Sequence, residues 1–407
     1  MPLVVQKFGG SSVADVEKIK NVARKGIREK KEGNDVIVVV SAMGKTTDQL
    51  IAMAHRITND PNPREMDMLM STGEQVSIAM LAIAFHSMGE KAISFTGPQV
   101  GIITDSTHRK ARIKSINTEK IHKALREGNI VIVAGFQGIS TENDITTLGR
   151  GGSDTTAVAL AAALNADVCD IYTDVDGVYT TDPRIVPKAR KLEKITYDEM
   201  LELASLGAKV LHSRSVELAK NYNVVIQVRS SFDDNPGTLV VKEDKSMEDI
   251  VVSGVAYNRN ETKISIIGVP DHPGVASEIF SKIADAHIVV DMIIQNVGGD
   301  GKNDISFTVG KEDFVQTLKI SKQLCEELGA NEVRSDDKIA KVSVVGVGMK
   351  THCGVAAKMF RALANAGINI DMISTSEIKI SCVIRSDDLD KAVQAIHDEL
   401  ELEAHPS

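Results

Sequence analysis

LVVQKFGGSSV, residues 3–13, joins a short apolar run to the start of a helical pattern. Residues 3–5 predict a buried strand, and the apolar spacing over 13–27 predicts a helix. The two glycines therefore lie at a strand-to-helix turn, where Ser11 or Ser12 is the expected helix N-cap. Such a turn points backbone N–H groups and the positive end of the helix dipole at an anion. It predicts either a phosphate site or a tight turn that needs glycine for positive φ. It is not a Walker A loop, because the lysine precedes the glycines.

Strands and helices continue to alternate up to about residue 230. The apolar β-branched runs predict strands buried on both faces, so the alternation indicates an α/β unit with a mainly parallel sheet. From 231 to 250 the chain is turn-rich and then charged, which predicts a linker. The strand runs are 36–42, 130–136, 169–175 and 224–230, and the clearest helical segments are 77–89 and 156–164.

The remainder of the chain contains an internal repeat. HPGVASEIFSKIADAHIVVDMI (272–293) aligns without gaps with HCGVAAKMFRALANAGINIDMI (352–373) at an offset of 80. Each copy predicts the order strand, helix, strand, strand, helix, with one more strand supplied nearby, as in ferredoxin-like modules. The glycine loop at each helix start, with Asp271 or Thr351, either binds a small ligand or only turns the chain.

Composition excludes several classes of function. The 407 residues have a net charge of −9, and only 3% are aromatic, so nucleic acid is not an expected partner. No run approaches the roughly 20 apolar residues of a membrane span, and the N-terminus does not resemble a signal peptide. Four scattered cysteines fit a reducing cytosol and predict no metal site. We expect a cytoplasmic protein without membrane partners.

The stretch TTLGRGGSDTTAVALAAAL, residues 146–164, indicates ligand binding most strongly. Its three glycines let the backbone approach a ligand closely, and Arg150 can clamp a carboxylate or phosphate with two hydrogen bonds. Asp154 falls in the first turn of the next helix, where a carboxylate can simply favour the dipole. Its position beside Arg150 favours the alternative, that it holds catalytic lysines or Mg²⁺.

A second polar loop, TDVDGVYTTDPR at 173–184, follows a predicted strand. Open α/β sheets bind ligands at the carboxyl ends of strands, and Tyr179 can pack on a nucleotide base; the alternative is a turn-rich surface loop. The DxDG spacing resembles the start of a calcium loop, but Ile185 stands where that loop needs glutamate. Weaker stretches at predicted strand ends are SAMGKTT (41–47), MSTGEQVS (70–77) and GAKVLHSRSVE (207–217).

Together these residues suit phosphoryl transfer to an amino acid. Lys7 and Lys209 suit a triphosphate, whereas Arg150 and Glu74 suit the carboxylate and the ammonium group of an amino acid. Phosphoryl transfer needs positioning and charge neutralisation more than covalent help. A carboxylate acceptor is already ionised at pH 7, so it requires no general base.

These motifs resemble those of the aspartate kinases, the carboxyl-phosphorylating entry enzymes of lysine, threonine and methionine biosynthesis. The resemblance covers nearly the whole chain. It implies an α/β fold, an amino-acid-kinase-type three-layer sandwich with a mainly parallel sheet, followed by two ferredoxin-like (βαββαβ) ACT domains. The implied parts are a catalytic domain (1–235), a linker with the first ACT strand region (236–262), and ACT domains at 263–335 and 341–407. The matching motifs are KFGGSS (7–12), SAMGKTTD (41–48), STGE (71–74), TTLGRGGSDTTA (146–157), TDVDGVYTTDPR (173–184) and STSEIKIS (374–381).

The resemblance also implies roles for individual residues. Lys7, Asp154 and Lys209 would form the catalytic charge constellation around the transferred phosphoryl group. Glu74 would bind the amine of aspartate and Arg150 one of its carboxylates. ATP, which would bring Mg²⁺ without a dedicated protein site, would contact Lys7, Phe8, Gly9, Gly10, Thr173, Asp174, Tyr179, Arg184, Lys209 and Val210. L-Aspartate would contact Ser41, Thr47, Glu74, Arg150, Gly151, Gly152, Ser153 and Asp154.

In the family, the ACT pair binds lysine, threonine or both at its interfaces, and it implies a homo-oligomer here. Val289 departs from the second copy, which has Asn369 there, and Cys353 stands opposite Pro273, so the identity of the effector stays open. Met247 is either an internal start for an ACT-only subunit of an α₂β₂ assembly or an ordinary linker residue. The effector positions would be Asp271, Gly274, Val275, Ala276, Asp291, Gln295, Asn369, Ile370, Ser376 and Glu377.

Two other functions compete with an allosteric aspartate kinase that makes 4-phospho-L-aspartate. One is a related kinase acting on glutamate, acetylglutamate or a nucleoside monophosphate; the two ACT units and the STGE stretch argue against it. The other is a non-catalytic amino-acid sensor with a vestigial kinase half. Intact Lys7, Arg150, Asp154 and Lys209 argue against the sensor.

Overall fold

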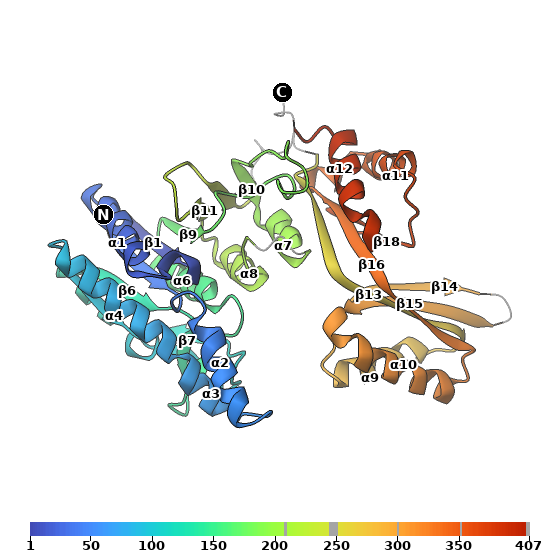
Figure 1. Ribbon diagram of the computed structural model, residues 1–407, viewed down its shortest axis with the longest axis horizontal. Coiled ribbons are helices and arrows are strands. Elements are labelled where there is room, and N and C mark those ends of the chain that lie inside the picture. The colour runs from blue at the N-terminus through green and yellow to red at the C-terminus, as the bar shows by residue number, and fades with distance from the viewer. Residues whose placement is uncertain (207–209, 244–250, 299–300, 351, 404–407) are drawn as a thin grey trace. The chain divides into compact units, whose positions relative to one another are not determined.

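The chain divides into two compact units in the computed structural model (Figure 1). Unit 1 consists of Met1–Val178 and Lys191–Met247, and unit 2 consists of Tyr179–Arg190 and Glu248–Ser407. The short segment Tyr179–Arg190 therefore leaves the first unit and belongs to the second. The structure describes residues 1–206, 210–243, 251–298, 301–350 and 352–403.

An eight-stranded sheet forms the core of unit 1, in the order β10-β12-β11-β9-β1-β2-β6-β3. Every neighbouring pair is parallel except β11 and β12, so the expected mainly parallel sheet is confirmed. Its strands are β1 (Leu3–Phe8), β2 (Asp35–Val40), β3 (Ala92–Phe95), β6 (Ile130–Ala134), β9 (Val168–Thr173), β10 (Lys194–Thr196), β11 (Ile226–Ser230) and β12 (Thr238–Val241). A smaller sheet, β5-β4-β7-β8, contains β4 (Ile102–Thr104), β5 (Ile113–Ile116), β7 (Gln137–Ser140) and β8 (Ile145–Thr147).

Helices cover both faces of the large sheet. On one face, α1 (Val16–Lys31) and α4 (Thr72–Ser87) share a buried cluster with Phe8 of β1. The next residue back, Lys7, points to the other face, where it meets α6 (Gly152–Leu164). The sheet is thus the middle of three layers. The remaining helices of unit 1 are α2 (Thr46–Ile57), α3 (Pro63–Met70), α5 (Glu119–Arg126), α7 (Tyr197–Ser205) and α8 (Ser213–Tyr222).

The first helix begins later than the sequence predicts. Gly10–Val13 forms a separate 3-10 turn, and α1 starts at Val16 with Asp15 as its N-cap. The Asp15 carboxylate accepts a hydrogen bond from the Lys18 N–H at 2.9 Å. The expectation that Ser11 or Ser12 caps this helix is therefore wrong. Val13 is buried in the turn and follows the same apolar spacing as the helix, so periodicity alone could not separate the two elements.

The predicted linker also contains ordered structure. Strand β12 lies within 231–250, pairs antiparallel with β11 and belongs to the large sheet. At four residues, it is too short for a recognisable alternation of apolar and polar positions.

Unit 2 contains a six-stranded sheet in the order β14-β15-β13-β16-β18-β17, antiparallel throughout. Its two long strands, β13 (Gly254–Pro270) and β16 (Glu332–Val345), pass through both repeats, as Figure 1 shows. Residues 254–258 pair with 341–345, whereas 263–267 pair with 332–336. Residues 254–258 thus supply the extra strand that the second repeat lacks in sequence. The other elements are α9 (Val275–Asp285), β14 (Val290–Val297), β15 (Lys302–Gly310), α10 (Phe314–Leu328), α11 (Val355–Asn365), β17 (Met372–Thr375), β18 (Lys379–Arg385) and α12 (Leu389–Glu399).

Among the described residues, one helical stretch, Pro63–Ser87, is long and apolar enough to cross a membrane. It consists of α3 and α4, and 56% of its apolar window is buried. Leu81 and Phe85 of α4 are fully buried in the core cluster against the sheet. This burial is typical of a core helix.

Candidate active site

A pocket of about 250 Å³ lies in unit 1, at the carboxyl ends of β1, β2 and β6. These three strands are parallel neighbours, so the turns that follow them meet at one edge of the sheet. Motifs that are far apart in sequence therefore line a single cavity. The lining residues are Lys7, Gly10, Ser41, Ala42, Gly44, Thr47, Glu74, Phe136, Gly149, Arg150, Gly151, Gly152, Ser153 and Asp154. They include all eight residues that the resemblance assigns to aspartate, together with Lys7 and Gly10 from the expected ATP contacts.

Lys7 and Asp154 form an ion pair in this pocket. The lysine Nζ lies 2.6 Å from Asp154 Oδ1, and the two side chains are 11% and 13% exposed. Asp154 lies in the first turn of α6, but its carboxylate also has this specific cationic partner. The geometry favours the interpretation that Asp154 holds a lysine over the one in which it only complements the helix dipole.

Glu74 places a carboxylate in the pocket wall with one oxygen unpartnered. The residue is 2% exposed, and its Oε1 accepts a hydrogen bond from the Ala42 N–H at 3.0 Å. Its Oε2 is buried and has no hydrogen-bond partner among the described residues. Burial raises the pKa of Glu74 to about 7, against two backbone hydrogen bonds that lower it. A buried carboxylate with a free oxygen suits a cationic ligand group such as an ammonium.

The glycine turn after β1 is tight for reasons of space. A Cβ on Gly10 would lie 2.9 Å from the Ala42 carbonyl oxygen and 3.0 Å from that of Gly44. The Gly44 N–H donates to the Gly10 carbonyl at 3.0 Å, so the turns after β1 and β2 touch through their backbones. Gly9 has φ −74°, and neither it nor Gly10 has positive φ. The alternative that these glycines are needed for positive φ is therefore wrong.

His212 presses on the glycine-rich loop, although the sequence did not single it out. Gly151 has φ +71°, and a Cβ there would lie 2.2 Å from the His212 ring. The pKa of His212 is lowered, mainly by burial. The nearby Asp154 acts in the opposite direction, whereas Arg214 and Arg150 also lower the pKa. The imidazole is consequently neutral at pH 7. The only sequence signal for it was its place in the weak stretch 207–217.

Phe136 is a second residue that the sequence did not single out. It lines the pocket with φ +70°, a conformation that is costly for an aromatic residue. Its N–H donates to Thr156 Oγ1 at 3.1 Å, and its ring lies against Gly152. Its position directly after an apolar strand, in AGFQG, is the signal that could have identified it. Ala42 and Gly44 were also missed, although they lie inside a motif that the sequence singled out, whereas Gly149 is one of the three glycines expected to approach a ligand.

Among the residues that the structure describes, the other ones expected at ATP do not line this pocket. Lys209 lies outside the described residues. Phe8 is fully buried and stacks on Tyr172 with ring centroids 4.4 Å apart, so its side chain belongs to the core. Its expected contact with ATP is thereby restricted to the backbone. Thr173 is the last residue of β9, and its hydroxyl donates a hydrogen bond to the carboxylate of the exposed Asp174. Val210 lies shortly before α8.

Tyr179 and Arg184 belong to unit 2. Arg184 is 87% exposed and pairs with Asp182 at 2.7 Å, which holds the pKa of that carboxyl at about 2. Within unit 2, the Tyr257 hydroxyl donates a hydrogen bond to Asp182 Oδ2 at 2.8 Å. Thr180 Oγ1 forms a hydrogen bond with His397 Nε2 at 3.0 Å. The expected nucleotide loop is thus bonded to the rest of unit 2 over part of its length.

The expected effector residues fall into two groups, one in each repeat, that occupy different positions of the repeat: Asp271 aligns with Thr351, and Asn369 with Val289. Gly274 and Gly354 occupy matching positions before α9 and α11, with φ +99° and +98°. Asp271 accepts a hydrogen bond from Asn303 at 2.9 Å. Asp291 pairs with the buried Lys341, so its carboxylate already has a cationic partner. The first group is Asp271, Gly274, Val275, Ala276, Asp291 and Gln295, and the second is Asn369, Ile370, Ser376 and Glu377.

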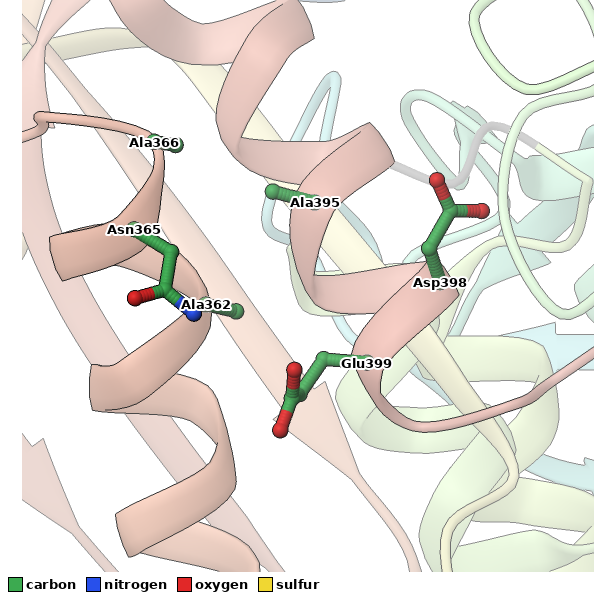
Figure 2. Close-up of a pocket in the computed structure, with 6 residues that line it drawn as sticks. All are labelled: Ala362, Asn365, Ala366, Ala395, Asp398 and Glu399. Atoms are coloured by element: carbon green, nitrogen blue, oxygen red, sulfur yellow. The ribbon is translucent and has the colours of Figure 1, made fainter.

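A larger hollow of about 410 Å³ lies elsewhere in unit 2. It separates the C-terminal halves of α11 and α12 (Figure 2). It is lined by three alanines, Asn365, Asp398 and Glu399, none of which the sequence analysis connects with chemistry. Glu399 pairs with Arg361, and Gln394 donates to Asp398. The smaller pocket in unit 1 is the chemically equipped one.

The family of the chain follows from comparison with known proteins. The model of the amino acid kinase family matches residues 2–230, and ACT domain models match 264–326 and 342–400. An aspartokinase of Pseudomonas aeruginosa is 56% identical over 406 residues, covering 99% of this chain and 98% of that protein. The chain belongs to the aspartokinase family. An aspartokinase of Mycolicibacterium smegmatis is 54% identical, covering 98% of this chain and 96% of that one.

Solved aspartokinase structures extend this likeness to the fold. Escherichia coli aspartokinase III in complex with aspartate and ADP is 27% identical, with a TM-score of 0.81 over 98% of this chain and 100% of that one. The same enzyme with lysine and aspartate has a TM-score of 0.78 at 27% identity, covering 98% of this chain and 99% of that one. The expected fold, an amino-acid-kinase α/β unit followed by ACT domains, is therefore confirmed, and so is the enzyme class, aspartate kinase.

Proposed function

We propose that this aspartokinase transfers the γ-phosphoryl group of ATP to the side-chain carboxylate of L-aspartate, giving 4-phospho-L-aspartate. One observation supports this most: the carboxylate of Glu74 with its unpartnered Oε2, the guanidinium of Arg150 and the Lys7–Asp154 pair line the same pocket of about 250 Å³. An amino acid with a second carboxylate matches that set of charges. The structural likeness of this chain to E. coli aspartokinase III, which is described in complex with aspartate and ADP, agrees with this choice.

In this proposal, each charged residue has a separate task. Glu74 binds the ammonium group and Arg150 binds one carboxylate, which leaves the other carboxylate as the nucleophile. Lys7 neutralises the charge that develops on the transferred phosphoryl group, and Asp154 holds the Lys7 ammonium in position. The acceptor is already ionised, so no base is needed, and neutral His212 is not required to remove a proton.

ATP would approach from the turn after β1 and would bring its Mg²⁺. The other proposed ATP contacts remain Phe8, Gly9, Gly10, Thr173, Asp174, Tyr179, Arg184, Lys209 and Val210. Lys7 Nζ lies over Gly9, which suits polyphosphate oxygens. No three His, Cys, Asp or Glu side chains cluster as a metal site in the described part of the chain. When bound with ATP, Mg²⁺ would neutralise phosphate charge.

We further propose that lysine, threonine or both inhibit the enzyme by binding at the ACT domains. The related E. coli enzyme has a described T-state complex with lysine. The effector would contact the two groups of residues named above, in a homo-oligomer that acts in the cytoplasm at the start of lysine, threonine and methionine biosynthesis. An α₂β₂ assembly would require translation from Met247, which lies outside the described residues.

Trapping the acyl phosphate with hydroxylamine tests the proposal. The purified enzyme receives Mg-ATP with aspartate or glutamate, each alone and with lysine, threonine or both. Hydroxamate should form with aspartate, at least tenfold faster than with glutamate, and an end product should suppress it. Efficient turnover of glutamate would identify a different acceptor. Amino-acid binding without turnover of ATP would identify a sensor.

A further inference from the structure

We propose that Arg214 and Asp67 are positioning residues that fix the loop containing Arg150, and that they thereby set the affinity for the acceptor. This inference rests on the proposed function of Arg150 as the residue that binds an aspartate carboxylate. Neither residue lines the pocket, and neither belongs to the substrate contacts implied by the resemblance.

Arg214 holds the start of the loop from one side. From the first turn of α8, its Nη1 donates to the Leu148 carbonyl at 2.8 Å and its Nη2 donates to the Ala111 carbonyl at 2.7 Å. Leu148 directly precedes the glycines that flank Arg150. The planar guanidinium joins two separate segments of backbone, which the single ammonium of lysine cannot do with the same geometry.

Asp67 holds the same strand end from the other side. Its side chain is completely buried on α3 and accepts hydrogen bonds from Thr147 Oγ1 at 2.5 Å and from the Arg109 N–H at 3.0 Å. His108 Nδ1 lies 2.8 Å from the second carboxylate oxygen. Asp67 thus fastens residue 147, which ends β8, and the loop at 108–109 to the same helix.

The glycine loop lies directly on this fastened backbone. A Cβ on Gly149 would lie 2.8 Å from the Arg109 carbonyl, and the Ala111 N–H donates to the Thr147 carbonyl at 3.0 Å. Residues 109–111 and 147–149 therefore form one layer, held by Asp67 and Arg214. A loop fixed in this way loses little conformational freedom when a ligand binds, which favours affinity.

The test compares Arg214→Lys, Arg214→Ala, Asp67→Asn and Asp67→Ala by steady-state kinetics. For both Arg214 variants and for Asp67→Ala, KM for aspartate should rise at least tenfold. In the same variants, KM for ATP and kcat should stay within threefold of the wild-type values, because these substitutions do not change the ATP-facing turn after β1. Asp67→Asn should have a smaller effect, since its amide oxygen can still accept from Thr147. Added guanidinium ion should lower the KM for aspartate of the Arg214→Ala variant, because it replaces the group that the substitution removes. Arg112→Lys is the matched control, an exposed arginine next to Ala111.

The Arg150→Lys variant separates this inference from the function on which it rests. If Arg150→Lys raises KM for aspartate and Arg214→Lys does not, the positioning role is wrong and the proposed function stands. If Arg150→Lys leaves KM for aspartate unchanged, Arg150 does not bind the acceptor, and the role proposed for Arg150, on which this inference rests, is wrong. If the Arg214 and Asp67 variants raise KM for ATP as much as KM for aspartate, the two residues have a general structural role and the inference is overturned. Should an alanine variant fail to fold, Arg214→Lys still decides the question.

Discussion

At the scale of single residues, the site depends on charges that the fold keeps in defined states. Lys7 is paired with Asp154 in a largely enclosed place, so its ammonium group is oriented before any ligand binds. Glu74 is different, because burial leaves one oxygen unpartnered and raises the pKa of the carboxyl to about 7. The first residue is held in place by its partner, and the second responds to pH.

Replacing Lys7 by alanine should reduce kcat far more than it weakens substrate binding. Loss of a preorganised cation at the transferred phosphoryl group costs about 2–4 kcal/mol in the barrier, or roughly 30- to 1,000-fold in kcat. Steady-state kinetics with ATP and aspartate measure this. Lys20→Ala, which removes an exposed lysine paired with Glu17 on α1, is the control. A near-normal kcat in Lys7→Ala would remove Lys7 from the catalytic group.

The value of kcat/KM for aspartate should fall as pH drops below about 7. Free enzyme with protonated Glu74 cannot form the ion pair with the substrate ammonium group, and the pKa of Glu74 is about 7. The Glu74→Gln variant should have a much higher KM and should lose this acidic limb. A wild-type profile that is flat from pH 8 to 5.5 would contradict the assignment.

Stability provides an independent check on Glu74. Its pKa is raised in the folded state, so its contribution to stability is largest at low pH and is lost as pH rises through about 7. At pH 8 the buried charge therefore costs free energy, and Glu74→Gln should unfold at a higher temperature than wild type. At pH 5 this advantage should largely disappear. Thermal unfolding at the two pH values measures the difference, and an equal Tm at pH 8 would show that the site already neutralises the charge.

At the scale of elements, the sequence indicated the long strands and helices well but not the short connections. Strands such as β2 and β6 are continuous apolar runs, and the repeat aligned both ACT units. The four-residue β12 and the turn Gly10–Val13 have no usable periodicity. Most of the pocket could be predicted because its residues lie in glycine-rich turns after strands. His212 could not, because its role arises from its contact with Gly151, which is distant in sequence and lies in a different motif. For Phe136, the sequence offers only its position after an apolar strand, since its contact with Gly152 also arises from the fold.

The contact between the turns after β1 and β2 predicts a difference between two adjacent glycines. Gly10→Ala should lower Tm clearly, since the new Cβ would lie 2.9 Å from the Ala42 backbone oxygen. Gly9→Ala is the matched comparison, because its nearest contact would be Lys7 Nζ at an ordinary 3.4 Å and its φ suits alanine. Thermal unfolding of both variants checks this. Equal values of Tm would show that the turns can separate without cost.

At the scale of the whole molecule, the two units are interleaved along the chain. Tyr179–Arg190 leaves unit 1 and contributes Val186 to the buried core of the second ACT repeat. The two ACT repeats also share β13 and β16, so each repeat uses backbone from the other. This sharing was not predictable in detail, because the sequence repeat begins only inside β13. Under the proposed inhibition, it would be a covalent route by which an effector influences the expected nucleotide loop, through different affinities for two states.

Changing Asp271 or Asn369 to alanine should raise the effector concentration needed for half-inhibition at least tenfold. The reason is loss of polar contacts to the amino-acid effector, which the proposal assigns to one of these residues in each repeat. Inhibition curves with lysine, threonine and both measure the change. Asp285→Ala, an exposed change on α9 of the same unit, should respond to effector like wild type. Unaltered inhibition in both test variants would place the effector elsewhere.

The most direct measurement follows the carbon that receives the phosphoryl group. Aspartate labelled with ¹³C at the side-chain carboxyl is incubated with enzyme and Mg-ATP, quenched with hydroxylamine and examined by ¹³C NMR. We predict that the labelled carbon appears as the hydroxamate with wild-type enzyme, and that Lys7→Ala yields it far more slowly. A hydroxamate at the α-carboxyl, or ADP release without any hydroxamate, would contradict phosphorylation of the aspartate side chain in this pocket.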